Sequence, residues 1–479
     1  MITSDDKRIV VTCLFASISF GILKGWMSPA ESEPYMDEIF HIPQVQKYCA
    51  GDFISWDPKI TTLPGLYLIT IGILNPISKF IGPIMTLCDT FHLRCVSLAL
   101  SVVNFLIIQR ITIQIHGARH GIFGDDKKCL LSSLNIALFP LLYFFSFFYY
   151  TDVGSTFMVL LMYCLHLEKR DWFAAFIGFL AVLFRQTNII WVAFVAVQAC
   201  GPHLIHAIHS LMHMDKKNVK FSLTFTGQLK ELIEGILALL LFYPSTLLKD
   251  VVIKCLLTAG GYLIVGLFFI AFIIINKGIV VGDRLAHTAV FHPTQMFYFF
   301  GFSLVMSFPH CISKMESFFK HSLKKKPFWL ATLSLFFYGI IREYGSLAHP
   351  YLLADNRHYT FYIWRKIIHR SNWSPYLGIP FYIYGAYCLS RTLRATGIIF
   401  RITFPIFLSF NLCPQLLLEF RYFIIPYLLY RLHIRPEKYS NLMIEMLLYL
   451  LINLGTMYAY MYKPFAWPHE PNSIQRFMW

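Results

Sequence analysis

The sequence predicts an all-α polytopic membrane protein, and three observations lead to this class. Of its 479 residues, 57% are hydrophobic and only 14% are charged, whereas a soluble domain carries about 25% charged residues. The mean hydropathy is +0.57, and long apolar runs recur from residue 9 to residue 462. The longest polar stretch, near residues 203–234, is shorter than the roughly 50 residues that a compact domain needs. We therefore expect one integral membrane domain over residues 1–479.

The apolar runs give the expected helices in chain order. Residues 9–27 form a first span without the small-residue cleavage site of a signal peptide, so we expect a retained anchor. The further runs predict about 12–14 transmembrane helices, although several are shorter than the roughly 20 residues of a straight span. These runs lie near residues 91–109, 129–149, 154–167, 172–184, 188–201, 251–275, 295–312, 328–342, 374–390, 402–418, 422–432 and 443–462.

The basic residues predict the orientation of the chain in the bilayer. A net charge of +15 would suggest nucleic acid as a partner of a soluble chain, but Lys and Arg are favoured in loops on the cytosolic side of a membrane. We therefore expect no nucleic-acid partner, and we expect residues 203–250 to form a basic cytosolic loop. The basic loops are 110–128, 168–170, 213–230, 314–326, 391–401 and 431–438; the loops expected on the far side are 28–90, 150–155, 185–188, 276–293, 343–373 and 419–422.

This orientation requires that the apolar stretch 66–87 does not cross the bilayer. Prolines and glycines divide it into short pieces, which suit helices that lie at the membrane interface. The sequon at Asn372 lies in a loop expected on the far side, which agrees with exposure there, although such a triplet also arises by chance. The residues that interrupt the stretch are Pro64, Gly65, Gly72, Pro76, Gly82 and Pro83.

The Cys, His and Glu residues of this sequence do not form a clear metal-binding motif. The eleven cysteines lie mostly in apolar runs and form no CxxC pair, so we interpret them as small core residues rather than as disulfides or metal ligands. Four histidines share roughly one face of a helix, but without nearby cysteine or carboxylate ligands an interfacial face is the better interpretation. Two glutamates could chelate a cation, yet no Asp-x-Asp pair accompanies them, and we predict no required metal. These residues are His203, His206, His209 and His213, and Glu31 and Glu33.

Ionisable side chains gather in three far-side loops, of which the first holds two adjacent carboxylates. On a helix, Asp37 and Glu38 diverge by about 100°, so at most one of them faces a reacting atom. Partial burial beside Tyr35 is expected to raise the pKa of such a carboxyl group until it accepts a proton from a hydroxyl group. The alternative is an acidic helix start after Pro34, where negative charge meets the helix dipole.

The other two loops each carry an arginine among aromatic residues. Arg357 and Arg421 could each bind a phosphate through a forked guanidinium group. The alternative is positioning at the interface, or internal pairing with Asp355 and Glu419 in the same motifs. Residues 185–188 likewise have two interpretations: a part of the substrate site, or a simple polar turn.

Six motifs resemble the endoplasmic reticulum α-1,2-glucosyltransferase family, nearly from end to end. They lie at residues 35–41, 56–67, 184–191, 352–362, 418–423 and 475–479. The resemblance implies transfer of the third, terminal glucose from dolichyl phosphate glucose to the diglucosylated dolichyl diphosphate oligosaccharide, before protein N-glycosylation. It also implies a multi-pass protein of the endoplasmic reticulum membrane with its active site facing the lumen. The implied architecture is GT-C, with interfacial helices and an essential acidic residue in the first lumenal loop.

The resemblance implies roles for single residues as well. Asp37 matches the catalytic acid residue and would deprotonate the acceptor 2-hydroxyl in one inverting displacement, because the donor glucose is β-linked and the product bond is α. A cation would stabilise the departing dolichyl phosphate; we expect Arg357 first, then Arg421 and His358, with Lys59 also in reach. No cofactor is expected besides the lipid-linked donor. The candidates for substrate binding are Glu38, Arg185, Gln186, Asp355, Asn356 and Glu419.

Three other classes of function compete with this one. A sister GT-C enzyme that adds another glucose or a mannose would share the architecture and differ only in its motifs. A polytopic transporter would place charged residues near the bilayer midplane and often show an internal repeat, and the sequence shows neither. A catalytically silent partner of another membrane protein would not be expected to keep Asp37 and the arginine motifs intact.

Overall fold

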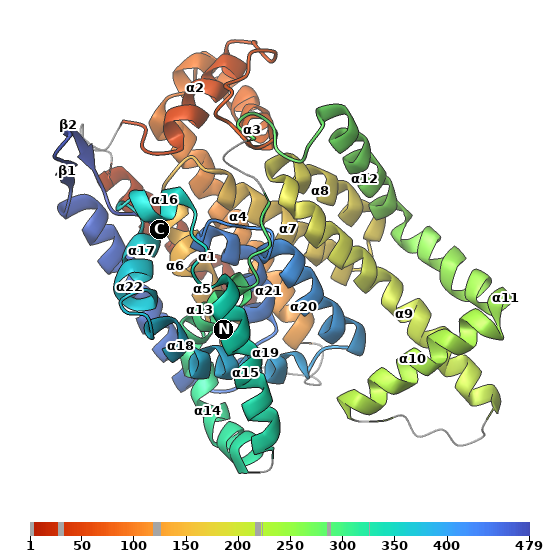
Figure 1. Cartoon of the computed structure of the whole chain (residues 1–479). Helices are drawn as coiled ribbons and strands as arrows, with labels where there is room; N and C mark the ends of the chain where they lie inside the picture. Colours follow the sequence, from red (N-terminus) through yellow and green to blue (C-terminus); the bar gives the residue numbers. More distant parts are fainter. Residues whose placement is uncertain are drawn as a thin grey trace.

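The computed structural model describes residues 4–26, 33–117, 126–215, 222, 224–284, 289–324 and 326–479. The chain is almost entirely helical (Figure 1), which confirms the predicted all-α membrane class. One short antiparallel hairpin, of β1 (Phe465–Trp467) and β2 (Glu470–Gln475), departs from it.

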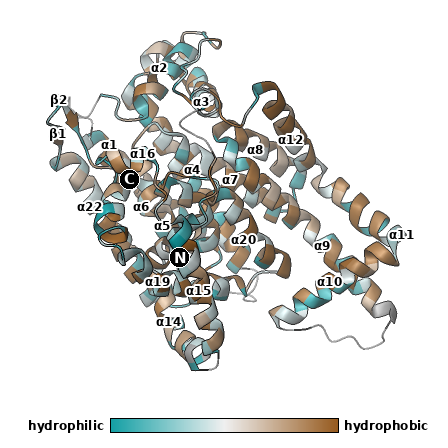
Figure 2. Cartoon of the chain, in the orientation of Figure 1, coloured by the Kyte–Doolittle hydropathy of each residue, from teal (hydrophilic) through white to brown (hydrophobic). Residues whose placement is uncertain are grey.

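The first half of the chain supplies the anchor, the first loop and the central helices. Apolar residues colour most of these helices brown in Figure 2, as expected where lipid surrounds the protein. The elements are α1 (Ser4–Trp26), α2 (Glu38–Cys49), α3 (Gly65–Ile81), η1 (Ile84–Leu87), α4 (Thr90–His116), α5 (Asp126–Ala137), α6 (Pro140–Phe145), α7 (Thr151–Leu167), α8 (Asp171–Phe184), η2 (Gln186–Asn188), α9 (Ile189–Asp215), α10 (Phe225–Leu241), α11 (Pro244–Thr246), η3 (Leu247–Ile253) and α12 (Lys254–Asn276).

The second half completes the bundle and ends in the hairpin. Buried aromatic residues near residues 139–150 and 420–430 join the two halves, for example through the stacked rings of Phe139 and Tyr427. The elements are α13 (Thr294–Met306), α14 (Phe308–Phe318), η5 (Phe319–Lys324), α15 (Pro327–Tyr344), α16 (Pro350–Ala354), α17 (Tyr359–Ile363), η6 (Trp364–Ile368), α18 (Ser374–Leu377), α19 (Ile379–Leu393), α20 (Ile398–Leu412), η7 (Phe420–Phe423), α21 (Ile424–Leu432) and α22 (Tyr439–Tyr462).

Fewer helices than predicted are long enough to cross a bilayer alone. Among the described residues, five are long and apolar enough, and a sixth span results if α13 and α14, which meet at 106°, count as one. Four shorter apolar helices of 10–17 residues accompany them. Breaks such as the one before Pro140 split apolar runs that the sequence suggested were continuous. The candidate spans are Asp5–Trp26, Thr90–His116, Gln186–Met212, Pro244–Asn276 and Tyr439–Tyr462.

The first loop is closed by a disulfide, which corrects the interpretation of all cysteines as free core residues. Cys49 at the end of α2 is bonded to Cys88, which follows η1. Both ends of the intervening segment are therefore on the same side of the membrane. Only six residues lie between Ile81 and Cys88, and four of them form η1, so the chain cannot return across a bilayer of about 30 Å after α3. This supports the prediction that α3 lies along the membrane, next to α2 at the top of Figure 1.

The first loop packs directly on the bundle at the start of α3. A Cβ atom at Gly65 would lie 2.6 Å from the carbonyl carbon of Leu183, near the end of α8. Only glycine allows this approach of two backbones. It fixes the first loop beside the turn at residues 185–188.

Arg431 corrects one detail of the charge-based orientation. We expected this residue in a solvent-facing basic loop, but its side chain is buried and forms a bidentate ion pair with Glu445 of α22. The positive charge of Arg431 therefore stabilises the packing of two helices and does not mark a cytosolic loop.

Candidate active site

Asp37 lies at the N-cap of α2, directly after a left-handed residue. Met36 has a φ of 55°, which costs about 1–2 kcal/mol for a residue other than glycine. The Asp37 carboxylate makes no cap hydrogen bond to α2. It instead receives a hydrogen bond of 2.9 Å from Nη1 of Arg421. Asp37 thus lies at the start of α2, as the alternative of an acidic helix start expects, but its carboxylate is bound by Arg421 and not by the helix amides.

Arg421 is the centre of a cluster of ion pairs formed where several helices begin or end. It pairs with Glu419 of its own motif, and its Nη1 lies 3.7 Å from Asp152 in the first turn of α7. Its guanidinium group also lies 5.5 Å from the centre of the Tyr150 ring. Arg185, at the end of α8, forms a second ion pair with Asp152 at 3.0 Å.

Asp37 is the accessible carboxylate of this cluster. Its side chain is 40% exposed, compared with 9% for Glu419 and 2% for Asp152. The cavity between Arg185 and Arg421 measures about 30 Å³, which holds a water molecule but no sugar. A substrate can therefore reach the cluster on the side of Asp37.

The electrostatics of Asp37 differ from the expectation of a raised pKa. Burial raises the pKa of this carboxyl group, but the charge of Arg421, the protonated form of His41 at acid pH and the hydrogen bond from Arg421 together hold the pKa below its usual value. His41 itself is neutral at pH 7, because burial lowers its pKa to about 4. Its Nδ1 lies 2.7 Å from the hydroxyl of Tyr67. Asp37 is therefore ionised throughout the neutral range.

Glu38, which we predicted as a candidate for substrate binding, forms a buried ion pair with Arg94. The side chain is fully buried, and Arg94 of α4 binds its two oxygens at 2.9 and 2.6 Å. The backbone amides of Tyr35 and Tyr149 donate to the same carboxylate. With both oxygens occupied, Glu38 ties the first loop to α4 and has no face open to a substrate.

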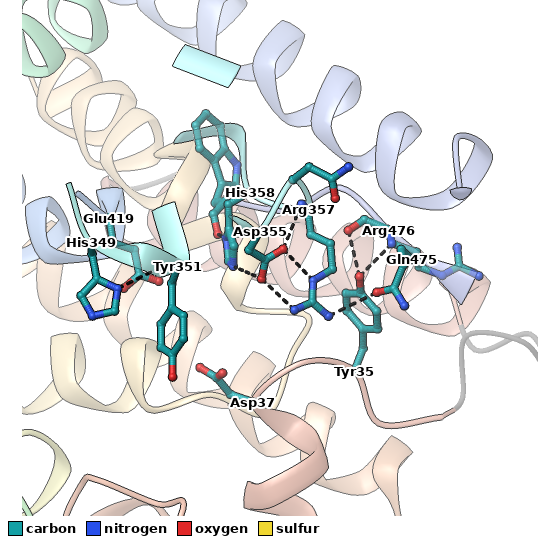
Figure 3. A network of polar contacts seen from close by, with 12 residues as sticks. Tyr35, Asp37, His349, Tyr351, Asp355, Arg357, His358, Glu419, Gln475 and Arg476 are labelled. Atoms are coloured by element: carbon teal, nitrogen blue, oxygen red, sulfur yellow. Dashed lines mark hydrogen bonds and ion pairs between the residues drawn. The ribbon is translucent and has the colours of Figure 1, made fainter. Parts of the chain in front are cut away.

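Arg357 occupies a second group of polar contacts (Figure 3). Its Nε and Nη2 donate to the two oxygens of Asp355 at 2.8 and 2.7 Å, and its Nη1 donates to Gln475 at 3.2 Å. Nδ1 of His358 lies 2.9 Å from the carbonyl oxygen of Trp479. The alternative of internal pairing, considered for both arginine motifs, is thus what the structure shows for each.

The remaining predicted residues also contact other parts of the protein. Gln186 donates to the carbonyl oxygen of Thr61, and Asn356 accepts from the indole of Trp467. Lys59 is exposed in the first loop, where its backbone amide donates to Asp57. The structure therefore brings most of the predicted residues to one region through a network of contacts but does not bring the Lys59 side chain into either cluster.

Four residues of the site were missed by the sequence analysis. Asp152 and Tyr150 follow a long aromatic run, and a carboxylate in such a context is a signal that could have been used. Arg94 lies inside an apolar helix, where a charge likewise implies a partner. Gln475 is in a recognised motif, but nothing in the sequence connects it to Arg357.

No metal centre is evident in the part of the chain that the structure describes. Within it, no group of three or more His, Cys, Asp or Glu residues is arranged to hold a metal ion. Nε2 of His203 lies 2.9 Å from the hydroxyl of Thr258, and Glu31 lies outside the described residues. Independence from metal remains a prediction.

The fold and these two clusters define a polytopic membrane protein with an ion-paired polar site where its helices end. The sequence model of the DIE2/ALG10 family matches residues 31–432, and the chain belongs to this family. A mouse (Mus musculus) relative is 40% identical over 478 residues, covering 98% of this chain and 96% of its own length. A human relative is 40% identical over 476 residues, and one from Drosophila melanogaster is 36% identical over 450 residues, covering 94% of both chains. All three are named Dol-P-Glc:Glc(2)Man(9)GlcNAc(2)-PP-Dol alpha-1,2-glucosyltransferase. No solved structure matches the chain.

Proposed function

We propose that this protein transfers glucose from dolichyl phosphate glucose to Glc(2)Man(9)GlcNAc(2)-PP-Dol in α-1,2 linkage, at the lumenal face of the endoplasmic reticulum membrane. The observation that carries the proposal is the similarity to enzymes of this name over 98% of the chain. The alternatives of a sister enzyme or a transporter have no comparable support. The disulfide in the first loop favours an oxidising compartment for that side of the membrane.

Asp37 is the base in this proposal. The acceptor 2-hydroxyl binds at the exposed side of Asp37 and gives it a proton while its oxygen bonds to the anomeric carbon of glucose. The bond from that carbon to the phosphate oxygen breaks, and dolichyl phosphate leaves with the electron pair. A single displacement inverts the β-linked donor to the α-linked product and needs one base.

The phosphate binds on the side of Arg357 and His358 rather than at Arg421. Around Arg421, three carboxylates face two guanidinium groups, so the group carries a net negative charge and repels an anion. Within the described part of the chain, Asp355 is the one carboxylate that forms an ion pair with Arg357, and His358 lies beside it. Arg357 is therefore the residue that stabilises the departing dolichyl phosphate in this proposal, and Arg421 holds Asp37 in place.

The test is glucose transfer by purified protein to the diglucosylated lipid-linked acceptor. Asp37→Asn is expected to lower turnover by on the order of 10²–10⁴-fold with donor binding retained. Glu38→Gln is the matched control, since it removes the neighbouring negative charge at a buried position. It is expected to lower the melting temperature, because the ion pair with Arg94 is lost, but to lower turnover of the folded protein far less than Asp37→Asn does.

Two results would contradict the proposal at different points. If Asp37→Asn kept full turnover, the base would be another residue. If the folded wild-type protein used the monoglucosylated or unglucosylated acceptor in place of the diglucosylated one, the activity would be that of a sister enzyme.

A further inference from the structure

The chain after α22 folds back over the region that holds Asp37 and Arg357. We call residues 465–479 the C-terminal hairpin: β1 and β2 pair with Phe465 opposite Gln475, and four residues follow. Figure 1 shows β1 and β2 beside α22, with the end of the chain next to α16 and α17. The segment is polar enough to leave the bilayer, but composition alone does not explain its position.

The C-terminal hairpin contacts the planar guanidinium group of Arg357 at one edge and over one face. Gln475 accepts a hydrogen bond from Nη1, and the ring of Trp467 lies 4.9 Å from the guanidinium carbon. Asp355 holds the remaining edge. An arginine held in this way keeps one orientation, which a flexible side chain at a membrane surface would not do.

The last residues of the hairpin also bind the backbone around Arg357. The amide of Met478 donates to the carbonyl oxygen of Arg357, and the amide of Tyr359 donates to the carbonyl oxygen of Met478, at 3.0 and 3.1 Å. The two segments therefore pair like strands at His358. The ring of Trp479 packs on Tyr359, which closes this contact.

The same hairpin binds the loop that carries Asp37. The hydroxyl of Tyr35 accepts a hydrogen bond of 2.7 Å from the amide of Arg476 and donates one of 2.9 Å to its carbonyl oxygen (Figure 3). Tyr35 is two residues before Asp37. The Arg476 side chain donates to the carbonyl oxygen of Tyr460 in α22, so the bridge is anchored on a long helix.

We propose that the C-terminal hairpin sets the position of Arg357 relative to Asp37, so that Gln475 and Tyr35 are positioning residues for the transfer reaction. Asp37 and Arg357 lie on separate loops, 320 residues apart in the chain, and the hairpin contacts both. The inference rests on the proposed function for its effect on turnover, but the bridge itself can be measured without it.

The first experiment is a double-mutant cycle on glucose transfer. Gln475→Ala is expected to lower kcat roughly tenfold or more with little change in the KM of the acceptor, because small displacements of a catalytic group have such effects. In an Arg357→Ala background, Gln475→Ala should cause no further loss. Gln198→Ala, which removes a hydrogen bond to the hydroxyl of Thr403 between α9 and α20, is the matched control and should leave kcat unchanged. Equal losses from Gln475→Ala in both backgrounds would overturn the proposal.

The second experiment measures the bridge by amide hydrogen exchange on the full-length protein. Tyr35→Phe should raise exchange of the amides at 357–361 on the order of fivefold, since it removes hydrogen bonds that hold the hairpin. Tyr143→Phe is the control, because it removes a comparable hydroxyl contact, to Ser19, elsewhere in the bundle. Unchanged exchange in Tyr35→Phe would disprove the bridge, even if the wild-type protein transferred no glucose. If Tyr35→Phe exchanged faster but kept full turnover, the hairpin would anchor the two loops without positioning Arg357 for the reaction, which would contradict the proposal.

Discussion

At the scale of single residues, the charge state of Asp37 is controlled by Arg421. Burial alone raises the pKa of Asp37, and the guanidinium group at 2.9 Å reverses that effect. A carboxylate with a lowered pKa is a weaker base, but it is always in the form that accepts a proton. The ionised form also stabilises the fold above the unfolded pKa of about 4. This contribution is lost as the pH falls through the folded pKa.

The pH dependence of transfer tests this control. In the wild-type protein, we expect kcat/KM to fall on the acid side only below about pH 4. Arg421→Gln removes the charge that lowers the pKa of Asp37 and leaves the effect of burial, so the acid limb should move to higher pH. The measurement is the pH profile of kcat/KM, with Arg365→Gln as a control that removes an arginine outside the cluster. An acid limb that stays in place in Arg421→Gln would mean that Asp37 is not the titrating base.

At the scale of elements, the first loop is held to the bundle at several points. The disulfide joins the end of α2 to the start of α4, the buried pair of Glu38 and Arg94 joins α2 to α4 again, and Gly65 brings α3 against α8. Asp37 begins α2, so these contacts determine where the carboxylate lies. Cys49 and Cys88 are 39 positions apart in the chain. The disulfide between them therefore reduces the conformational entropy of the unfolded first loop.

Loss of the disulfide is expected to destabilise the first loop. Cys49→Ser should lower the free energy of unfolding by about 2–4 kcal/mol and lower turnover through the displaced Asp37. Thermal unfolding in detergent with and without a reductant measures this effect, and wild-type protein should become like the variant when reduced. Cys13→Ser, at an exposed free cysteine, is the matched control. A reductant effect that persists in Cys49→Ser would place the sensitive cysteine elsewhere.

The elements show what sequence patterns could and could not predict. Apolar runs located most of the helices, because burial in lipid requires them. Pro64 and Gly82 correctly marked the two ends of α3, whereas Pro76 lies inside this helix and does not divide it. The break at Pro140 and the 106° bend between α13 and α14 depend on how neighbouring helices pack, so length alone overestimated the number of spans. The disulfide was missed because Cys49 and Cys88 have no spacing signal in a 39-residue interval.

At the scale of the whole molecule, the site assembles from loops that the charge pattern placed on one side. Thr61 contacts both Gln186 and Val281, and Arg421 contacts Asp37 and Asp152. The residue types were predictable, because charges in an apolar chain are costly and therefore stand out. Their pairings were not, since a partner hundreds of residues away leaves no trace in a single sequence.

A second polar centre lies inside the bundle, where the sequence analysis expected no ionisable group. Arg431 of α21 and Glu445 of α22 form two hydrogen bonds of 2.6 Å, and His310 of α14 and Asn135 of α5 bind the same carboxylate. Four helices thus meet at one fully buried carboxylate. Its partners satisfy the charge, so it fixes the packing of these helices rather than a transport path.

This centre predicts an asymmetric response to substitution. In Glu445→Leu, among the described residues, the Ser132 hydroxyl is the side chain that still accepts a hydrogen bond from the buried Arg431. An unpaired buried charge of this kind should lower the free energy of unfolding by about 3–5 kcal/mol. Arg431→Met should cost less, because His310 and Asn135 still bind Glu445. The double variant should recover to within about 2 kcal/mol of the wild type, since replacing both charges with apolar groups removes the cost of an unpaired ion. Thermal unfolding in detergent measures all three. A double variant less stable than either single one would show that the pair stabilises the bundle by itself.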